Sequence, residues 1–455
     1  MTDEPNLDFA DIQGNILRGY GFPLTRYVFV EVVEASAGRR LLDSLVDPVT
    51  TNQEWTSGKP DETVNVALTY AGLVAIETAH AVLDAFPESF REGMAARATI
   101  LNDVGPSDPA TWDTGLGTGE AHILVTINGR SAEPLDTRRA WLDEQIAASD
   151  GGLRVALEQE AGALEGAREH FGWADGFAQP SVEGSGLPPK PGEGIPTRLG
   201  TWRPLKAGEF ILGYADEDGG PPAAPPDPFG RNGTYMVWRK LHQDVALFRE
   251  TIHEAAKHYA GGEELLAAKI VGRWPDGTSL VMSPDKPDPT IAGNRDRLND
   301  FRYDDDPDGM RCPIGAHVRR AFPRDALGWG GRMSTRHRMI RRGVPYGQPL
   351  PPGAPDDGVD RGMIFVCFVA DLARQFEVVQ VQWCNDGNAF GLGHDRDWLL
   401  GDNDGSGKMT INGEPPFFLT PQPSFVTARG GEYLFVPGLD ALRALATSAP
   451  AMAVR

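Results

Sequence analysis

The stretch RYVFVEVV (residues 26–33) places β-branched or aromatic side chains at six of eight positions and predicts a buried strand. Outward from it, the first half of the chain predicts two more strands, at residues 64–70 and 122–128, and three helices, at residues 71–85, 137–148 and 153–160. Strands and helices alternate without the regular repeat of a parallel sheet. This arrangement favours an α+β fold of the ferredoxin-like type.

The second half of the chain repeats this α+β character. Its most continuous apolar run, MIFVCFV at residues 363–369, predicts a central strand at residues 362–370. The other expected elements are strands at residues 209–214, 234–241 and 431–437 and helices at residues 244–258 and 371–383. A Gly- and Pro-rich stretch at residues 181–204 separates the two sets of elements. We therefore expect two domains, residues 1–205 and 206–455.

The charge of the chain argues against two classes of partner. It has 43 Lys and Arg residues against 64 Asp and Glu residues, a formal net charge of −21. This balance opposes nonspecific binding to nucleic acid and docking on anionic lipid. It should instead attract cationic substrates or metal ions. No run of about 18 apolar residues occurs, so the sequence predicts no membrane span.

The compartment is indicated by the cysteines and by the N-terminal sequence. Cys312, Cys367 and Cys384 form no CxxC pair and give no disulfide framework, so we expect free thiols. The N-terminal residues lack the basic and apolar regions of a signal peptide and also lack a twin-arginine pair. We therefore expect a cytoplasmic protein and leave unconventional export open.

Three glycine-rich segments carry the residues that we expect to do chemistry. They are HFGWADGF at residues 170–177, CPIGAHVRR at residues 312–320 and RRGVPYG at residues 341–347. Together they offer a carboxylate, an imidazole and a fixed cation, the groups with which a haem peroxidase splits a peroxide. Long irregular stretches at residues 184–206, 284–312 and 343–361 are of the kind that line functional sites.

His317 is the candidate axial ligand of a haem iron. A haem iron takes an imidazole whose other ring nitrogen is hydrogen-bonded. Arg319, Arg320 and Arg324 follow closely, and guanidinium groups pair with carboxylates in bidentate fashion, which suits two haem propionates. The plainer interpretation is a structural histidine beside an exposed basic loop.

Asp175 and Arg341 are the candidate catalytic residues. Asp175 stands in a GxxDG pattern, where glycines let the backbone turn tightly, and its carboxylate could move a proton between the two oxygens of a peroxide. Arg341 would stabilise the negative charge that develops as the O–O bond breaks. The plainer interpretations are an Asx turn at Asp175 and a solvated basic patch around Arg341.

Two more residues are candidates for supporting roles. Asp371 follows the predicted central strand and could accept the ring N–H of His317, although it suits a helix N-cap at least as well. Tyr346 is a candidate radical relay for donors too bulky to reach a haem, because it stands near Arg341 in a loop that we expect at the surface. Packing of that loop is the alternative for Tyr346.

These segments resemble the dye-decolourising peroxidase family over nearly the whole chain. DIQGNIL at residues 11–17 is similar to the family's opening, and GEYLFVP at residues 431–437 to its closing strand. The resemblance places Asp175 at the distal acid/base, His317 at the proximal haem ligand and Arg341 at the distal arginine. FVCFVAD at residues 365–371 ends where the family often has the partner of the haem histidine, which here is Asp371.

The resemblance implies a fold of two ferredoxin-like halves, of the dimeric α+β barrel type, with antiparallel sheets. It implies one haem b per chain, held mainly by the C-terminal half, with hydrogen peroxide as oxidant. Dyes and phenolic compounds are the implied donors, with manganese(II) a further candidate, and a homo-oligomer is left open. The length and the long loops are most similar to the large subgroup known from fungi and some bacteria.

Two functions stay open at this point. One is a haem peroxidase, and the other is a haem-binding or iron-handling protein with little peroxidase turnover. A third reading, a structural or partner-binding α+β protein, requires the purified protein to stay colourless when haem is supplied.

Overall fold

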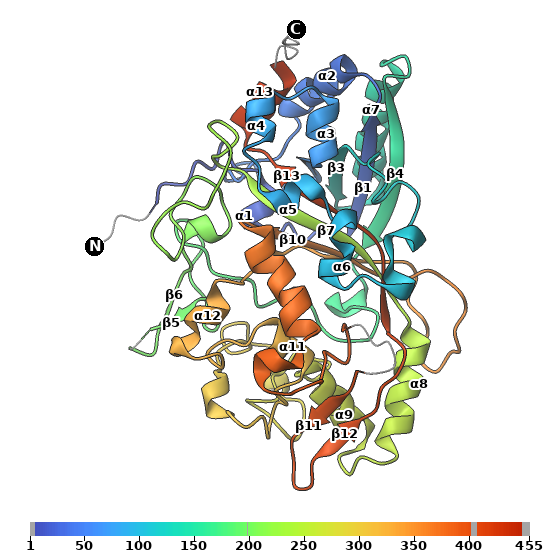
Figure 1. The fold of residues 1–455 in the computed structure, drawn as a ribbon, viewed down its shortest axis with the longest axis vertical. Helices are drawn as coiled ribbons and strands as arrows, with labels where there is room; N and C mark the ends of the chain where they lie inside the picture. The colour runs from blue at the N-terminus through green and yellow to red at the C-terminus, as the bar shows by residue number, and fades with distance from the viewer. Residues whose placement is uncertain (1–4, 198, 402–406, 448–455) are drawn as a thin grey trace.

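A nine-stranded antiparallel sheet runs through the protein. The computed structural model describes residues 5–197, 199–401 and 407–447. Within these ranges the strands follow the order β4-β1-β3-β2-β13-β7-β10-β8, and β9 pairs with β10 beside β8. The sheet thus consists of two groups of strands, one from each half of the chain (Figure 1).

The first group has ferredoxin-like topology. Its elements are β1 (Leu24–Val32), α2 (Ala35–Val46), β2 (Glu62–Leu68), β3 (Ile123–Gly129), α7 (Ala132–Ala147) and β4 (Leu153–Gly162). They follow the sequence βαββαβ, and the four strands lie in the order 4-1-3-2. Helix α2 buries Leu41, Leu42 and Leu45 in the core, as expected for an amphipathic helix against a sheet.

The second group repeats this topology with longer insertions. Its elements are β7 (Thr234–Gln243), α8 (Val245–Ala256), β8 (Ile340–Arg341), β9 (Val344–Tyr346), β10 (Gly362–Val369), the π-helical segments η8 (Leu372–Glu377) and η9 (Val379–Cys384), and β13 (Val426–Val436). β10 lies between β7 on one side and β8 with β9 on the other, as expected for its continuous apolar run. The predicted fold of two ferredoxin-like halves with antiparallel sheets is confirmed.

The two groups of strands meet at a narrow junction. β13 pairs with β2 through one residue pair, Phe435 with Leu68. The following helix α13 (Leu439–Thr447) crosses to the first half and packs against α2 (Figure 1). The last strand and helix therefore tie the halves together, and the predicted boundary between residues 205 and 206 stays a prediction.

The insertions of the second half form a separate layer at the end away from α2 and α13 (Figure 1). It contains α9 (Gly262–Val271), α11 (His317–Ala321), β11 (Met409–Ile411) and β12 (Phe417–Leu419). A second core, with Phe248, Trp274 and Trp398 among its buried residues, holds these insertions together.

The remaining elements are short. They are α1 (Gly14–Leu17), α3 (Tyr70–Ala75), α4 (His80–Leu83), α5 (Glu88–Glu92), η1 (Ala95–Arg97), α6 (Ala98–Leu101), η2 (Gly105–Ser107), η3 (Pro109–Thr111), η4 (Glu165–Ala167), β5 (Ile195–Pro196), β6 (Trp202–Arg203), η5 (Ala207–Glu209), α10 (Pro289–Ala292), η6 (Tyr303–Asp305), η7 (Trp329–Gly331), α12 (Arg332–Thr335) and η10 (Gly387–Phe390). Of the helices in the described ranges, none has the length and apolar character needed to cross a membrane.

Three predicted elements are wrong. Residues 153–160, expected as a helix, belong to strand β4, which pairs with β1 along its length. Residues 71–85 form two short helices instead of one, because the chain turns at Glu77, whose φ is 58°. Residues 209–214, expected as a strand, lie at the end of η5 and in turns. The three cysteines are free and buried, as predicted.

Candidate active site

His317 opens helix α11, and a buried carboxylate holds its ring. Its Nδ1 lies 2.7 Å from Oδ2 of Asp397, whose Oδ1 accepts hydrogen bonds from the backbone N–H groups of Leu399 and Leu400 at 3.0 Å. Burial opposes ionisation of Asp397, but His317 and the other hydrogen bonds outweigh it and lower the pKa of that carboxyl. The ionised carboxylate therefore accepts the Nδ1 proton, and Nε2 is left free to act as a ligand.

Asp371 is not the partner of His317, contrary to one of its two predicted roles. Its Oδ1 accepts a hydrogen bond from the backbone N–H of Arg374 at 2.9 Å, so it caps helix η8. The N-cap interpretation is therefore confirmed. Asp397 was missed because it follows His317 by 80 residues and no local spacing connects the two. The only hint is an Asp in the HDRDW segment at residues 394–398.

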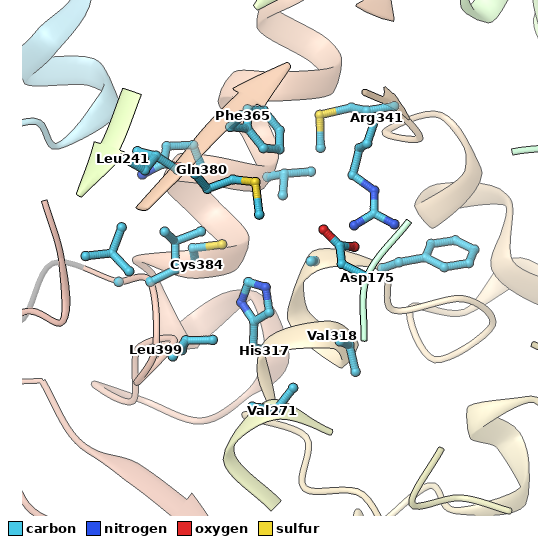
Figure 2. A pocket seen from close by; sticks show the side chains of 18 of the residues that line it. Asp175, Leu241, Val271, His317, Val318, Arg341, Phe365, Gln380, Cys384 and Leu399 are labelled. Carbon is cyan, nitrogen blue, oxygen red and sulfur yellow. The ribbon is translucent and has the colours of Figure 1, made fainter. Parts of the chain in front are cut away.

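Asp175 and Arg341 lie together on the opposite side of the same cavity from His317. Figure 2 shows the Asp175 carboxylate and the Arg341 guanidinium pointing toward each other, above the His317 ring. Arg341 belongs to β8, and its Nη2 donates to the carbonyl oxygen of Phe177 at 2.9 Å. The arginine is thereby attached to the loop that carries Asp175. The structure brings the three predicted residues to one cavity.

The loop that carries Asp175 is folded around a half-buried acid, Glu169. The Glu169 carboxylate accepts hydrogen bonds from the backbone N–H groups of Phe171 at 2.8 Å and Trp173 at 2.9 Å, and from Nε2 of Gln243 at 2.8 Å. Burial raises the pKa of Glu169. Neither Glu169 nor Gln243 was singled out from the sequence. Gln243 could not be found from local spacing, because it lies on strand β7, 74 residues from Glu169.

The glycines of the GxxDG pattern have the conformation that the pattern predicts. Gly172 and Gly176 have φ angles of 108° and 81°, in the region that side chains rarely adopt. Asp175 between them stays exposed to solvent, in contrast to Asp397.

The cavity is apolar and has the size of a ligand pocket. It encloses about 350 Å³, within the range of about 300–1,000 Å³ for such pockets. Its apolar walls come from both the sheet and the insertions, including Leu241, Val271, Val318, Phe365 and Leu399 (Figure 2). The site therefore lies where the second group of strands meets the inserted layer.

Two buried arginines, Arg324 and Arg338, line another part of the cavity, and no carboxylate of the described ranges forms an ion pair with either of them. Arg324 Nη1 donates to the carbonyl oxygens of Gly192, Asn299 and Phe301 at 3.0–3.2 Å. Arg338 Nη1 is buried and has no hydrogen-bond partner within the described residues. Burial lowers the pKa of Arg338 to about 9. A buried, uncompensated cation of this kind is costly unless an acidic group binds beside it.

Arg319 and Arg320 do not face this cavity, so their predicted role at haem propionates is wrong. Arg319 is buried against the carbonyl oxygens of Cys312 and Asp306, at 2.8 and 3.0 Å. Arg320 donates to the carbonyl oxygens of Trp383 and Asp395, at 2.8 and 2.9 Å. Arg319, two positions after His317, lies about 200° around the helix axis and faces away from its ring, whereas the Arg320 guanidinium group is turned toward Trp383 and Asp395.

Tyr346 is buried rather than at the surface, contrary to expectation, with 4% of its surface exposed. It ends strand β9, and its hydroxyl donates to Oδ1 of Asp360 at 2.9 Å. The Asp360 side chain is 51% exposed, so it links the buried phenol to the solvent.

Comparison with known proteins matches two domain families and full-length relatives. Residues 11–151 match the DyP dimeric alpha+beta barrel domain, and residues 225–391 match the C-terminal domain of Dyp-type peroxidases. The multifunctional dye peroxidase DyP2 of Amycolatopsis is 30% identical over 98% of this chain and 97% of its own length. The similarity thus extends over both halves of the fold.

Solved structures agree with this similarity. An ancestral D-type dye-decolorizing peroxidase is 28% identical, with a TM-score of 0.85, over 98% of this chain and 100% of its own. A dye-decolorizing peroxidase in complex with 2,6-dimethoxyphenol is 27% identical, with a TM-score of 0.83, over 97% of this chain and 100% of its own. Fold, cavity and sequence agree, and the chain belongs to the dye-decolorizing peroxidase family.

Proposed function

We propose that this peroxidase binds one haem b between His317 on one side and Asp175 with Arg341 on the other, reduces hydrogen peroxide, and oxidises dyes and phenolic compounds. One observation carries the assignment of residues. A single apolar cavity has an imidazole tied to a buried carboxylate on one wall and a carboxylate with a guanidinium group on the opposite wall (Figure 2).

The residues present fit a haem. His317 would hold the iron through Nε2, because its Nδ1 is bonded to Asp397. Arg338, with its unpartnered Nη1, and Arg324 suit the two propionate carboxylates. The apolar walls suit the macrocycle. A haem bound there would supply the redox chemistry for the reduction of peroxide.

The side chains of the cavity each have a separate task. Asp397 keeps the proton on Nδ1 of His317 and makes the ring a stronger ligand. Asp175 takes a proton from the peroxide oxygen on the His317 side of the cavity. It gives this proton to the other peroxide oxygen, which leaves as water. Arg341 stabilises the negative charge on that leaving oxygen. Overall, one hydrogen peroxide and two phenols become two waters and two phenoxyl radicals.

Tyr346 serves in this proposal as a relay for donors that cannot enter the cavity. Oxidation of a phenol releases a proton, and Asp360 is hydrogen-bonded to the hydroxyl and can accept it. Because Asp360 is half-exposed, the proton can leave to solvent while the electron moves inward. Burial and Asp360 raise the pKa of Tyr346, so the phenol stays protonated until it is oxidised.

Three finer predictions go with the proposal. Manganese(II) is a further candidate donor, drawn by the net charge of −21. Homo-oligomerisation and a cytoplasmic location stay predictions.

Within the described ranges no group of three or more His, Cys, Asp or Glu side chains is arranged to hold a metal ion.

The experiment is to add haem to the purified protein, record the Soret band, and then supply peroxide with 2,6-dimethoxyphenol or an anthraquinone dye. We expect one haem per chain and catalytic oxidation of both donors. Haem binding without oxidation of either donor would favour the iron-handling alternative. A protein that stays colourless would contradict both.

A further inference from the structure

A second cavity, of about 570 Å³, lies between the two groups of strands. Its walls include Tyr27 of β1 and Phe368 of β10, so both halves of the fold contribute to it. It shares Asp175, Phe177 and Arg341 with the first cavity. The catalytic pair therefore forms a common wall between two spaces, of which the proposed peroxidase reaction uses only one.

The second cavity is strongly cationic, although the chain as a whole carries a net charge of −21. The acidic residues of its lining are Asp175 and Glu193. The basic residues of its lining are Arg18, Arg168, Lys190, Arg295, Arg341 and Arg342. Within the described residues, none of these six cations forms an ion pair with a carboxylate.

Three of these arginines have only weak or uncharged partners. Arg342 donates to the backbone carbonyl oxygens of Asn15, Ile16 and Arg341, at 3.0–3.2 Å. Burial lowers the pKa of Arg342 to about 10. Arg18 lies over the ring of Trp55, with 5.7 Å between the guanidinium carbon and the ring centroid. Arg295 is exposed. Cations without anions around a cavity favour an anionic ligand.

Aromatic side chains form much of the rest of the cavity. Tyr20, Phe22, Tyr27, Phe177 and Phe368 line it. Such rings pack against a planar ligand with an edge-to-face or offset geometry. A ligand with both an aromatic ring and a negative charge would satisfy both features of the lining.

We infer that the second cavity binds an aromatic carboxylate, with its charge among Arg18, Arg295 and Arg342 and its ring against the aromatic lining. A phenolic acid bound there is an electron donor next to the wall formed by Asp175 and Arg341. Each phenolic acid loses one electron and one proton to become a phenoxyl radical, and two of them reduce one hydrogen peroxide to two waters. The oxidation rests on the proposed function, but the binding does not.

The binding is tested by calorimetry with 4-hydroxycinnamate as the probe, in the absence of peroxide. The variant is Arg18→Gln/Arg295→Gln, which spares Arg341 and its neighbour. The matched control is Arg40→Gln/Arg91→Gln, which removes the same charge at exposed positions outside both cavities. We expect the cavity variant to bind about tenfold more weakly or worse, as the loss of a charge-assisted contact implies, and the control to bind as wild type. Equal affinity in both variants would overturn the inference.

Steady-state kinetics then tests the oxidation. We expect the cavity variant to raise KM for 4-hydroxycinnamate while leaving KM for its methyl ester and for 2,6-dimethoxyphenol unchanged. If the acid binds but only blocks peroxide, or if the variant affects acid and ester alike, the cavity is no donor site. A wild-type protein that oxidises none of the three phenols would instead contradict the proposed peroxidase function, and calorimetry would still report on binding.

Discussion

On one side of the first cavity Asp397 is fully buried and bonded to His317, whereas on the other side Asp175 is exposed and the Arg341 guanidinium group donates to the backbone carbonyl oxygen of Phe177. The His317 side is fixed by an ionised carboxylate with three hydrogen bonds. The Asp175 side is carried by a loop wrapped around Glu169. A ligand to a metal must keep its position, whereas a group that moves protons must exchange them with water. The burial of Asp397 therefore suits the holding of a ligand, and the exposure of Asp175 suits the exchange of protons.

The comparison is tested most strongly at His317. His317→Ala should bind haem weakly or not at all, because it removes the imidazole that Asp397 orients. His337 also lines the cavity, but its ring is hydrogen-bonded to the backbone carbonyl oxygen of Arg374 instead of to a carboxylate. Haem content after gel filtration is the measurement. The control is His394→Ala, which removes an exposed histidine outside the cavity and should leave haem content unchanged. Full haem content in His317→Ala, with an unchanged spectrum, would exclude His317 as the ligand.

The exposed side is tested at Asp175. Asp175→Asn keeps the shape of the side chain and removes its ability to accept a proton. The peroxide-dependent change of the Soret band should slow by about 10²–10⁴-fold, the usual contribution of general acid/base catalysis, with haem retained. Stopped-flow absorbance measures this rate, and Asp356→Asn, an exposed acid in another loop, is the control. A normal rate in Asp175→Asn, with Arg341 essential, would reverse the two roles.

Arg341→Leu removes the charge on the same side and should slow the same step by about 10²–10³-fold, the cost of losing one such donor. The same stopped-flow assay applies. Arg332→Leu removes an exposed arginine of helix α12 and should have no effect on the rate. If both substitutions slow the reaction equally, the effect comes from the net charge of the protein and not from the position of Arg341.

Asp397→Asn weakens the buried side without removing the ligand. We expect haem affinity or activity to fall by about 10–100-fold, as is typical for the hydrogen-bond partner of a metal ligand. Haem titration and steady-state kinetics are the measurements. Asp371→Asn is the control, because Asp371 caps helix η8 and does not touch His317. Loss of haem affinity in Asp371→Asn, with Asp397→Asn normal, would contradict the pairing seen here.

Tyr346→Phe tests whether bulky donors pass electrons to the first cavity through Tyr346, outside both of its walls. Its effect on activity should be the smallest of the five. We expect several-fold slower oxidation of a bulky dye, with unchanged oxidation of small phenols, since only the hydroxyl bonded to Asp360 is lost. The control is Tyr259→Phe, in the second core. Unchanged kinetics on the bulky dye, together with an unchanged radical signal by electron paramagnetic resonance, would leave Tyr346 a packing role only.

The sequence predicts the ferredoxin-like halves well, because most strands are apolar and locally distinct. The wrong prediction of a helix where strand β4 lies has a physical cause. Its segment LRVALEQE at residues 153–160 leaves most side chains at least partly exposed, and its polar residues are also compatible with the outer face of a helix. Pairing with β1 decides the outcome, and that contact joins segments more than 120 residues apart.

A site residue can be predicted from the sequence when a single short motif identifies it. His317, Asp175 and Arg341 each stand in a glycine-rich motif, so their presence at one cavity could be predicted. Two of their partners could not, because Asp397 and Gln243 reach the site through contacts between segments more than 70 residues apart. Arg319 and Arg320 show the reverse error, since closeness in sequence to His317 does not place their side chains near its ring.

The late position of β13 and α13 in the chain has a consequence for the order of events during synthesis. β13 is the only described strand that joins the two groups of strands, and residues 424, 426 and 428 also line the first cavity. During translation the cavity wall is incomplete until these residues have left the ribosome, and α2 lacks the helix that covers it. Native contacts between distant segments form late in folding. The cavity that we propose to hold the haem is therefore complete only after the residues before and within β13 are in place.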